Sequence, residues 1–95
     1  MKRLFLLRHC DAVQFDEKAN DHEKKLTKKG QKDAKLISQW FKKNNVSVDC
    51  ILTSTALRTL ETSKRIFKEQ EKKIIENKNL YLCNRQVITD ILKML

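Results

Sequence analysis

The sequence predicts an α/β fold built around a parallel sheet. Two compact apolar runs, at residues 2–7 and 49–53, are too short for helices and suit buried strands. Helical spacing of apolar residues follows each run, so strand and helix alternate along the chain. Parallel neighbouring strands require long crossovers, and this alternation supplies them.

The first helix is predicted over residues 28–43. The apolar residues of one arc of that helix are Ala34, Ile37, Trp40 and Phe41, while lysines occupy the opposite side. Thr27 stands directly before the helix, where its hydroxyl suits an N-cap.

A second helix is predicted after the strand at 49–53. Ser54 or Thr55 is placed to cap it, and apolar residues recur at steps of three and four to about residue 70. Residues 73–75 then supply a third strand, with 80–82 as a further extended piece.

Asn84 opens the last predicted helix. Its apolar positions recur from Val87 to Leu95. Cys50, inside the second apolar run, is expected to pack in the core. Together the segments predict a layered domain with at least three strands.

The chain is strongly basic. Its 21 Lys and Arg against 12 Asp and Glu give a net charge of +9, which favours phosphates, nucleic acid or acidic protein surfaces as partners. Residues 24–43 hold eight lysines against Asp33 alone. A solvated helix face explains such a stripe, and nucleic-acid binding stays open beside it. Only six aromatic residues and the lack of a reading motif speak against nucleic acid.

Composition excludes several other classes. One glycine and no proline exclude a glycine-rich phosphate loop, so any chemistry must come from side chains. Three cysteines without a CxxC pair suggest neither a disulfide framework nor a zinc ribbon, and they favour a reducing, cytoplasmic setting. No apolar stretch approaches the roughly 20 residues of a membrane span. No HExxH motif or carboxylate cluster suggests a metal.

Candidate functional residues follow the predicted strands. Ligand sites of open α/β sheets lie beyond the carboxyl ends of the strands. The first strand runs into Arg8 and His9, and Arg58 begins the helix after the second strand. Two guanidiniums and an imidazole suit a phosphoryl group. Nearby positive charge disfavours imidazolium, so neutral His9 can attack phosphorus if a backbone carbonyl holds its other ring nitrogen.

Three segments resemble motifs of the histidine phosphatases of the phosphoglycerate mutase superfamily, most closely the small single-domain phosphohistidine phosphatases. They are, in order, LFLLRHCDA, DHEKKLTKKG and ILTSTALRTLET. The first resembles the RHG motif, with Cys10 where Gly or Ala is usual. The second resembles Asp-x-x-Arg-Pro-Leu-Thr-x-x-Gly, with Lys24 and Lys25 replacing Arg and Pro. The third resembles Thr-Ser-Pro-x-x-Arg-Ala-x-x-Thr, with Thr55 replacing Pro.

The resemblance implies a three-layer α/β/α sandwich with a mostly parallel sheet and a mechanism without metal or cofactor. It implies that His9 is the nucleophile that becomes phosphorylated, and that Arg8 and Arg58 bind the phosphoryl oxygens. Lys24 stands where the branch places a further phosphate-facing Arg. Ser54 either caps the helix only or also touches the phosphate pocket.

One catalytic group of the family has no counterpart in this sequence. Members carry a second histidine in a Gly-His pair after a later strand, whereas the only other histidine here is His22, interpreted as a solvated loop residue. We therefore expect residues 1–95 to be the N-terminal portion of a single histidine phosphatase domain, incomplete at its C-terminal side and impaired in catalysis.

Three functions remain open at this point. The first is dephosphorylation of protein phosphohistidine, or of a small phosphate substrate, through phospho-His9. Phosphoprotein is favoured because residues 80–85 contain no acid to protonate an alcohol leaving group. The second is a catalytically inactive phosphate-binding or interaction remnant, and the least favoured is a basic nucleic-acid-binding module. No membrane partner is expected, and the oligomeric state is open.

Overall fold

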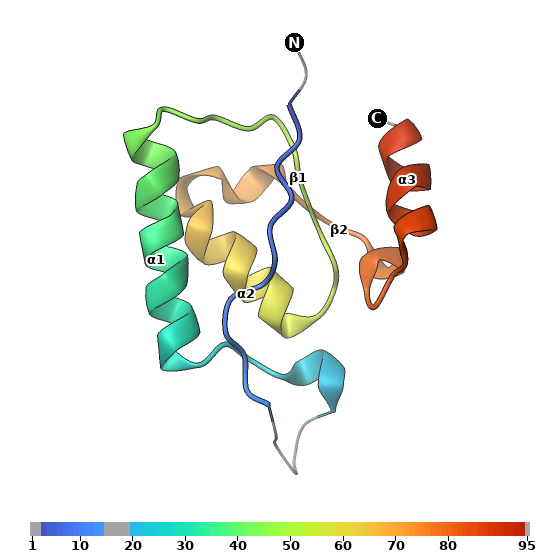
Figure 1. Cartoon of the computed structure of the whole chain (residues 1–95), viewed down its shortest axis with the longest axis horizontal. Coiled ribbons are helices and arrows are strands. Elements are labelled where there is room, and N and C mark those ends of the chain that lie inside the picture. The colour runs from blue at the N-terminus through green and yellow to red at the C-terminus, as the bar shows by residue number, and fades with distance from the viewer. Residues whose placement is uncertain (1–2, 15–19, 95) are drawn as a thin grey trace.

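The computed structural model describes residues 3–14 and 20–94 of the chain. Its main elements are α1 (Lys28–Lys43), β1 (Ile51–Thr53), α2 (Leu57–Ile66), β2 (Ile74–Glu76) and α3 (Arg85–Lys93). Short 3-10 helices lie at Asp21–Glu23, Lys68–Lys73 and Lys78–Leu80. Figure 1 shows α1 and α2 on one side of the strands and α3 on the other, which is the predicted α/β/α arrangement. No helix in the described part of the chain is long and apolar enough to cross a membrane.

The sheet is parallel, as predicted. β1 pairs with β2 so that Ile51 lies opposite Ile74 and Thr53 lies opposite Glu76. Ile51 and Thr53 are buried and the residue between them is half-buried, because successive side chains of a strand point to opposite faces. Cys50 precedes Ile51 and is exposed, so the prediction that it packs in the core is wrong for the same reason.

α1 occupies the range predicted from its apolar spacing. Thr27 caps it as expected, since Thr27 Oγ1 accepts the backbone N–H of Gly30 at 3.1 Å. Gly30, Ala34 and Phe41 are its buried residues and lie on one side of the helix. Trp40, predicted on the same arc, is 51% exposed, because it lies about 100° around the helix from Phe41, at the edge of the buried side. The lysines of the opposite side remain exposed.

α2 is shorter than predicted and has a different start. Its N-cap position is Ala56, with extended φ and ψ of −62° and 139°, so the prediction of a Ser54 or Thr55 cap is wrong. Ser54 Oγ lies too far ahead of the helix and instead meets the N–H of Ala56 at 3.4 Å and Thr59 Oγ1 at 2.6 Å. After α2 the chain tightens into the 3-10 helix Lys68–Lys73.

The N-terminal segment, residues 3–9, is extended but belongs to no strand in the described structure. The prediction of a strand at 2–7 is therefore wrong for residues 3–7, and Lys2 lies outside the described residues. A segment forms a strand only where its backbone exchanges hydrogen bonds with a neighbouring strand. Among the described residues, no strand makes such hydrogen bonds to residues 3–7. Leu4 and Leu6 are accordingly 60% and 77% exposed.

The chain after β2 also departs from prediction before the last helix. Lys78–Leu80 forms a 3-10 turn, and Leu82 has a positive φ of 49°, so no extended piece forms at 80–82. The last helix is confirmed, because Asn84 caps α3 by accepting the N–H of Val87 at 3.1 Å. Leu95, expected at its end, lies outside the described residues.

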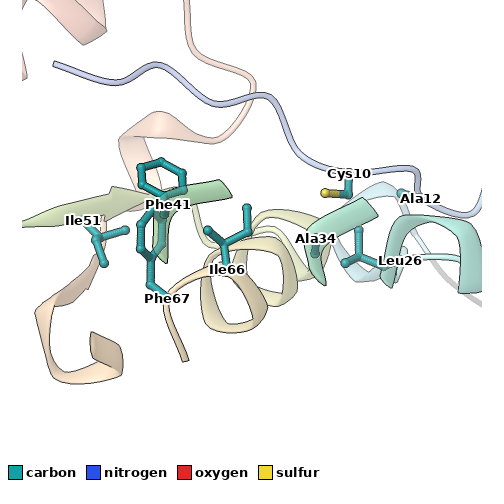
Figure 2. Packing of buried hydrophobic residues seen from close by; sticks show 8 residues of the cluster. All are labelled: Cys10, Ala12, Leu26, Ala34, Phe41, Ile51, Ile66 and Phe67. Carbon is teal, nitrogen blue, oxygen red and sulfur yellow. The ribbon is translucent and has the colours of Figure 1, made fainter. Parts of the chain in front are cut away.

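The core joins the N-terminal segment to α1 and α2 (Figure 2). Cys10 and Ala12 are buried with Leu26 and Ala34 at one end of it. At the other end the Phe41 ring lies 5.1 Å from that of Phe67 and 5.7 Å from that of Phe5. The segment that carries His9 is therefore held by packing rather than by a strand ladder.

Replacing Gly30 by Ala tests the contact between α1 and the loop after His9. A Cβ at position 30 would lie 2.1 Å from the backbone oxygen of Asp11. We expect Gly30→Ala to lower the free energy of unfolding by about 1–3 kcal/mol, although Ala favours a helix over Gly by about 1 kcal/mol. Urea denaturation measures the change, with Gln39→Ala at an exposed position of α1 as control. A variant at least as stable as wild type would show that the two backbones are not this close.

Candidate active site

His9 has one ring nitrogen fixed by the backbone. The ring is half-buried, and its Nδ1 lies 2.8 Å from the carbonyl oxygen of Cys10. A carbonyl oxygen only accepts, so Nδ1 carries the proton and donates it. In the neutral ring this tautomer places the lone pair on Nε2, as a nucleophilic imidazole requires.

Arg8 and His9 line one open hollow between the N-terminal segment and α1. Other polar residues of its wall are Asp11, Gln14, Lys29 and Asp33. Lys29 Nζ lies 3.6 Å from the Asp33 carboxylate, and Thr27 Oγ1 donates to Asp11 Oδ2 at 2.6 Å. Both carboxylates thus have partners, while Arg8 is exposed beside His9.

Arg58 does not line that hollow and is held by Asp21. Its Nη1 donates to the Asp21 carbonyl oxygen at 2.8 Å and its Nη2 to Asp21 Oδ2 at 3.2 Å. Lys24 Nζ lies 4.0 Å from the other carboxylate oxygen of Asp21 and donates to the Gln14 carbonyl at 3.1 Å. Arg58 and Lys24, both predicted to bind phosphate, therefore both contact the side chain of Asp21.

Tyr81 and His22 complete this cluster. The Tyr81 hydroxyl donates to Asp21 Oδ2 at 2.5 Å, and the Arg58 guanidinium lies 5.9 Å from the centre of the Tyr81 ring. His22 Nε2 meets Thr55 Oγ1 at 2.8 Å, with its ring 4.9 Å from that of Tyr81. His22 is half-buried and bonded, so its interpretation as a solvated loop residue is wrong.

Sequence reasoning missed Asp21 and Tyr81. Asp21 is the first residue of the second motif, but within that motif a role in binding phosphate was predicted only for Lys24. Tyr81 carries no signal in the sequence, because it meets Asp21 from 60 residues away. Their partnership depends on the turn at Lys78–Leu80, which the sequence did not predict.

Thr62 connects the two groups of residues. The buried N–H of Cys10 donates to Thr62 Oγ1 at 3.0 Å, and the Thr62 hydroxyl donates to the Arg58 carbonyl at 2.8 Å. The residue after His9 is thereby bonded to the turn of α2 that carries Arg58. Thr62 is the last residue of the third motif, and the sequence alone assigned it no role.

Ser54 lies apart from the hollow that holds His9. It is buried at the approach to α2, and its hydroxyl is used by Ala56 and Thr59. Its contacts order the turn between β1 and α2. This turn places Arg58 and Thr55 toward the Asp21 cluster.

Cys10 stands next to His9 but is a poor competing nucleophile. Burial raises the pKa of the Cys10 thiol above its usual value, against a smaller opposing effect of Thr62. The thiol therefore stays protonated at neutral pH, and a thiolate is the form that attacks. His9 is the better candidate for covalent chemistry at this site.

Comparison with known families identifies the class. The model of the histidine phosphatase superfamily (branch 1) matches residues 4–84, which include His9, Arg58 and the Asp21 cluster. The chain belongs to that superfamily.

Individual proteins are also similar to this chain. A protein of Agrobacterium tumefaciens assigned as the phosphohistidine phosphatase SixA superposes with a TM-score of 0.85 at 22% identity, over 93% of this chain and 58% of its own. Its counterpart from Nakamurella multipartitia gives 0.78 at 27% identity, over 90% and 47%. An uncharacterised chloroplastic protein of Arabidopsis thaliana is 38% identical over 63 residues, 66% of this chain and 29% of its own. The chain thus spans from under a third to little more than half of these relatives.

Substituting Thr62 tests the link between His9 and α2. Thr62→Val keeps the shape but leaves the buried N–H of Cys10 without an acceptor, which costs about 1–3 kcal/mol. Thermal or urea unfolding measures the loss. Thr89→Val is the matched control, because the Thr89 hydroxyl makes the same bond to the carbonyl four residues earlier, Arg85, and accepts from no other element in the described chain. Equal effects of the two substitutions would contradict a tertiary role for Thr62.

Titrating Tyr81 tests the Asp21 cluster. The hydrogen bond to Asp21, with burial and the charge of that carboxylate, raises the pKa of Tyr81 above its usual value of about 10. Because the neutral phenol is favoured in the folded chain, its stabilising effect is complete below about pH 10 and is lost as the pH rises through the raised value.

The chain has a single tyrosine, so its phenolate absorbance reports this group alone. We expect Asp21→Ala to move the titration midpoint down toward the usual value, and Glu71→Ala, at an exposed carboxylate, to leave it in place. A midpoint indifferent to Asp21→Ala would show that Tyr81 does not donate to Asp21.

Proposed function

We propose that this chain contributes the nucleophile of a phosphohistidine phosphatase, which removes the phosphoryl group of a phosphorylated protein histidine through a phospho-His9 intermediate. Membership of the histidine phosphatase superfamily supports the reaction class. The observation that carries the proposal is the bond from His9 Nδ1 to the Cys10 carbonyl, while Nε2, beside Arg8, makes no hydrogen bond to the described residues.

In the first step His9 Nε2 attacks phosphorus while the bond from phosphorus to the substrate imidazole breaks. The leaving imidazole takes up a proton, and the phosphoryl group stays on His9. Arg8, Arg58 and Lys24 bind its oxygens, for which Arg58 and Lys24 must exchange the Asp21 carboxylate for phosphate. In the second step water attacks phosphorus, so that inorganic phosphate leaves and His9 is restored.

We propose that the second step is slow where only residues 1–95 serve it. Family members use a second histidine at the phosphoryl group, and the other histidine here, His22, is engaged with Thr55. Losing one donor of this kind costs roughly 10²–10³ in rate. Phospho-His9 would then accumulate.

The substrate class rests on the segment after β2. Residues 80–85 contain no acid, and imidazole needs less help from a proton donor than an alkoxide does. The relative from Nakamurella multipartitia, assigned as a phosphohistidine phosphatase, supports the same class. We further propose that residues 1–95 form part of a single histidine phosphatase domain, which the match over 4–84 supports. The three free cysteines support a cytoplasmic location.

A catalytically inactive phosphate-binding protein is the second candidate. The specific observation in its favour is that Arg58 and Lys24 already hold an anion, the Asp21 carboxylate, while His9 lies in a separate hollow. Such a protein would bind phosphate and be protected by it against melting, without transfer to His9.

Covalent labelling of His9 tests the proposed function. The full chain is incubated with a protein carrying labelled phosphohistidine, and the label on the chain is followed at high pH, where phosphohistidine survives. We expect wild type to take up label and His9→Gln to take up none, because Gln offers no nucleophilic nitrogen. His22→Gln, at the only other histidine, should keep the label on His9.

Equal labelling of wild type and His9→Gln would reject His9 as the nucleophile. No labelling of wild type, with a melting temperature that still rises in phosphate, would replace the enzyme by the phosphate-binding protein.

A further inference from the structure

One face of α1 is built almost entirely of lysines. We define the lysine face by its exposed residues Lys28, Lys32, Lys35 and Lys43. They lie opposite the buried side of the helix, and α1 runs for 16 residues, or about 24 Å at 1.5 Å per residue. The face therefore offers charge along a length comparable to a protein interface.

Little in the described chain compensates this charge. Lys29, on the flank, pairs with Asp33 at 3.6 Å, and Lys42, on the same side of α1 as Lys35, pairs with Glu69 at 3.3 Å; the lysine face is defined without these two paired lysines. Across residues 3–14 and 20–94, no carboxylate lies within ion-pair distance of the face itself. Like charges four apart on a helix, as at Lys28 and Lys32, repel and destabilise it. Exposure to water requires only that these positions be polar, and acidic or uncharged residues would serve equally well. Exposure alone therefore does not explain why all four residues of the lysine face are positively charged.

The lysine face starts beside the candidate nucleophile. Thr27, which caps α1, donates its backbone N–H to the Asp11 carbonyl at 3.0 Å, two residues after His9. Lys29, on the next flank of the helix, lines the same hollow as Arg8 and His9. None of the four residues of the lysine face lines the hollow itself, but Lys28 directly precedes Lys29, so a protein bound over the hollow adjoins the start of the face.

The chemistry of the face suits carboxylates better than nucleic acid. No arginine occurs between His9 and Arg58 in the sequence. Because the arginine fork matches carboxylate and phosphate oxygens alike, this absence does not decide between the two kinds of partner. No aromatic residue belongs to the face, and binding of single-stranded nucleic acid uses aromatic side chains for stacking.

We propose that the lysine face docks a carboxylate-rich surface next to the phosphohistidine of the protein substrate. The proposal rests on the proposed function, and it adds the class of substrate, an acidic phosphoprotein. Because exposed charges are screened by salt, the docking contributes most at low ionic strength.

Binding of two peptides to the full chain tests the proposal. Both carry a non-hydrolysable phosphohistidine analogue; one has Asp and Glu around it and the other has Asn and Gln at the same positions. Fluorescence anisotropy at low salt measures each Kd. We expect wild type to prefer the acidic peptide by about tenfold, as several exposed charge pairs together provide. The triple variant Lys28→Gln, Lys32→Gln, Lys35→Gln should lose that preference.

The matched control is Lys64→Gln, Lys68→Gln, Lys72→Gln, which removes the same charge from three exposed lysines outside α1. It should keep the preference. Equal loss in both triple variants would show that net charge, not the lysine face, attracts the peptide, and no preference in wild type would refute docking directly. An oligonucleotide that displaces the acidic peptide, and binds more tightly than it, would assign the face to nucleic acid instead.

Labelling of His9 separates this proposal from the proposed function. Label on His9 without a preference for the acidic peptide would overturn only the docking surface. A preference that depends on the lysine face in a chain whose His9 never takes up label would support the docking surface and overturn phosphoryl transfer.

Discussion

The N–H of Cys10 donates to Thr62 Oγ1, and that hydroxyl donates to the Arg58 carbonyl, at 3.0 and 2.8 Å. This pair of bonds is the constraint on which the candidate site depends. The N-terminal segment has no strand partner in the described structure, so its position comes from this link and from burial of Cys10 and Ala12. Packing and the backbone bond between Thr27 and Asp11 also hold this segment, but the link through Thr62 is what joins the residue after His9 to the turn of α2 that carries Arg58.

The site is organised by charge as much as by packing. Arg58 is mostly shielded from solvent, with a side chain 12% exposed, and a shielded guanidinium requires an anion. Asp21 supplies it, and the hydrogen bond from Tyr81, together with Arg58 and Lys24, lowers the pKa of the Asp21 carboxyl below its usual value. The carboxylate therefore stays ionised at neutral pH. A phosphoryl group offers more acceptor oxygens than a carboxylate, so in the proposed mechanism it would compete with Asp21 for these cations.

Periodic segments and the parallel pair of β1 and β2 were predicted well, but the strand predicted at 2–7 is absent from the described residues 3–7. The apolar arc of α1 and its Thr27 cap are local features, and both stand where the sequence put them. The prediction of a strand at 2–7 was wrong because a run of leucines indicates only that a segment is apolar. It does not indicate that another strand lies beside the segment. The prediction that Ser54 caps α2 was wrong because three residues separate β1 from α2, so that Ala56 takes the N-cap position. Apolar spacing does not reveal the length of this connection.

The sequence by itself determined the α/β class, the helices, the parallel pair of strands and the motifs that contain His9, Arg58 and Lys24. Only the tertiary structure decided that Arg58 and Lys24 meet on Asp21, that Tyr81 joins them, and that Thr62 ties their helix to the residue after His9. The reason is that periodicity records contacts three or four residues apart. The bonds that assemble this site join residues 37, 52 and 60 positions apart, and their existence depends on the path of the whole chain.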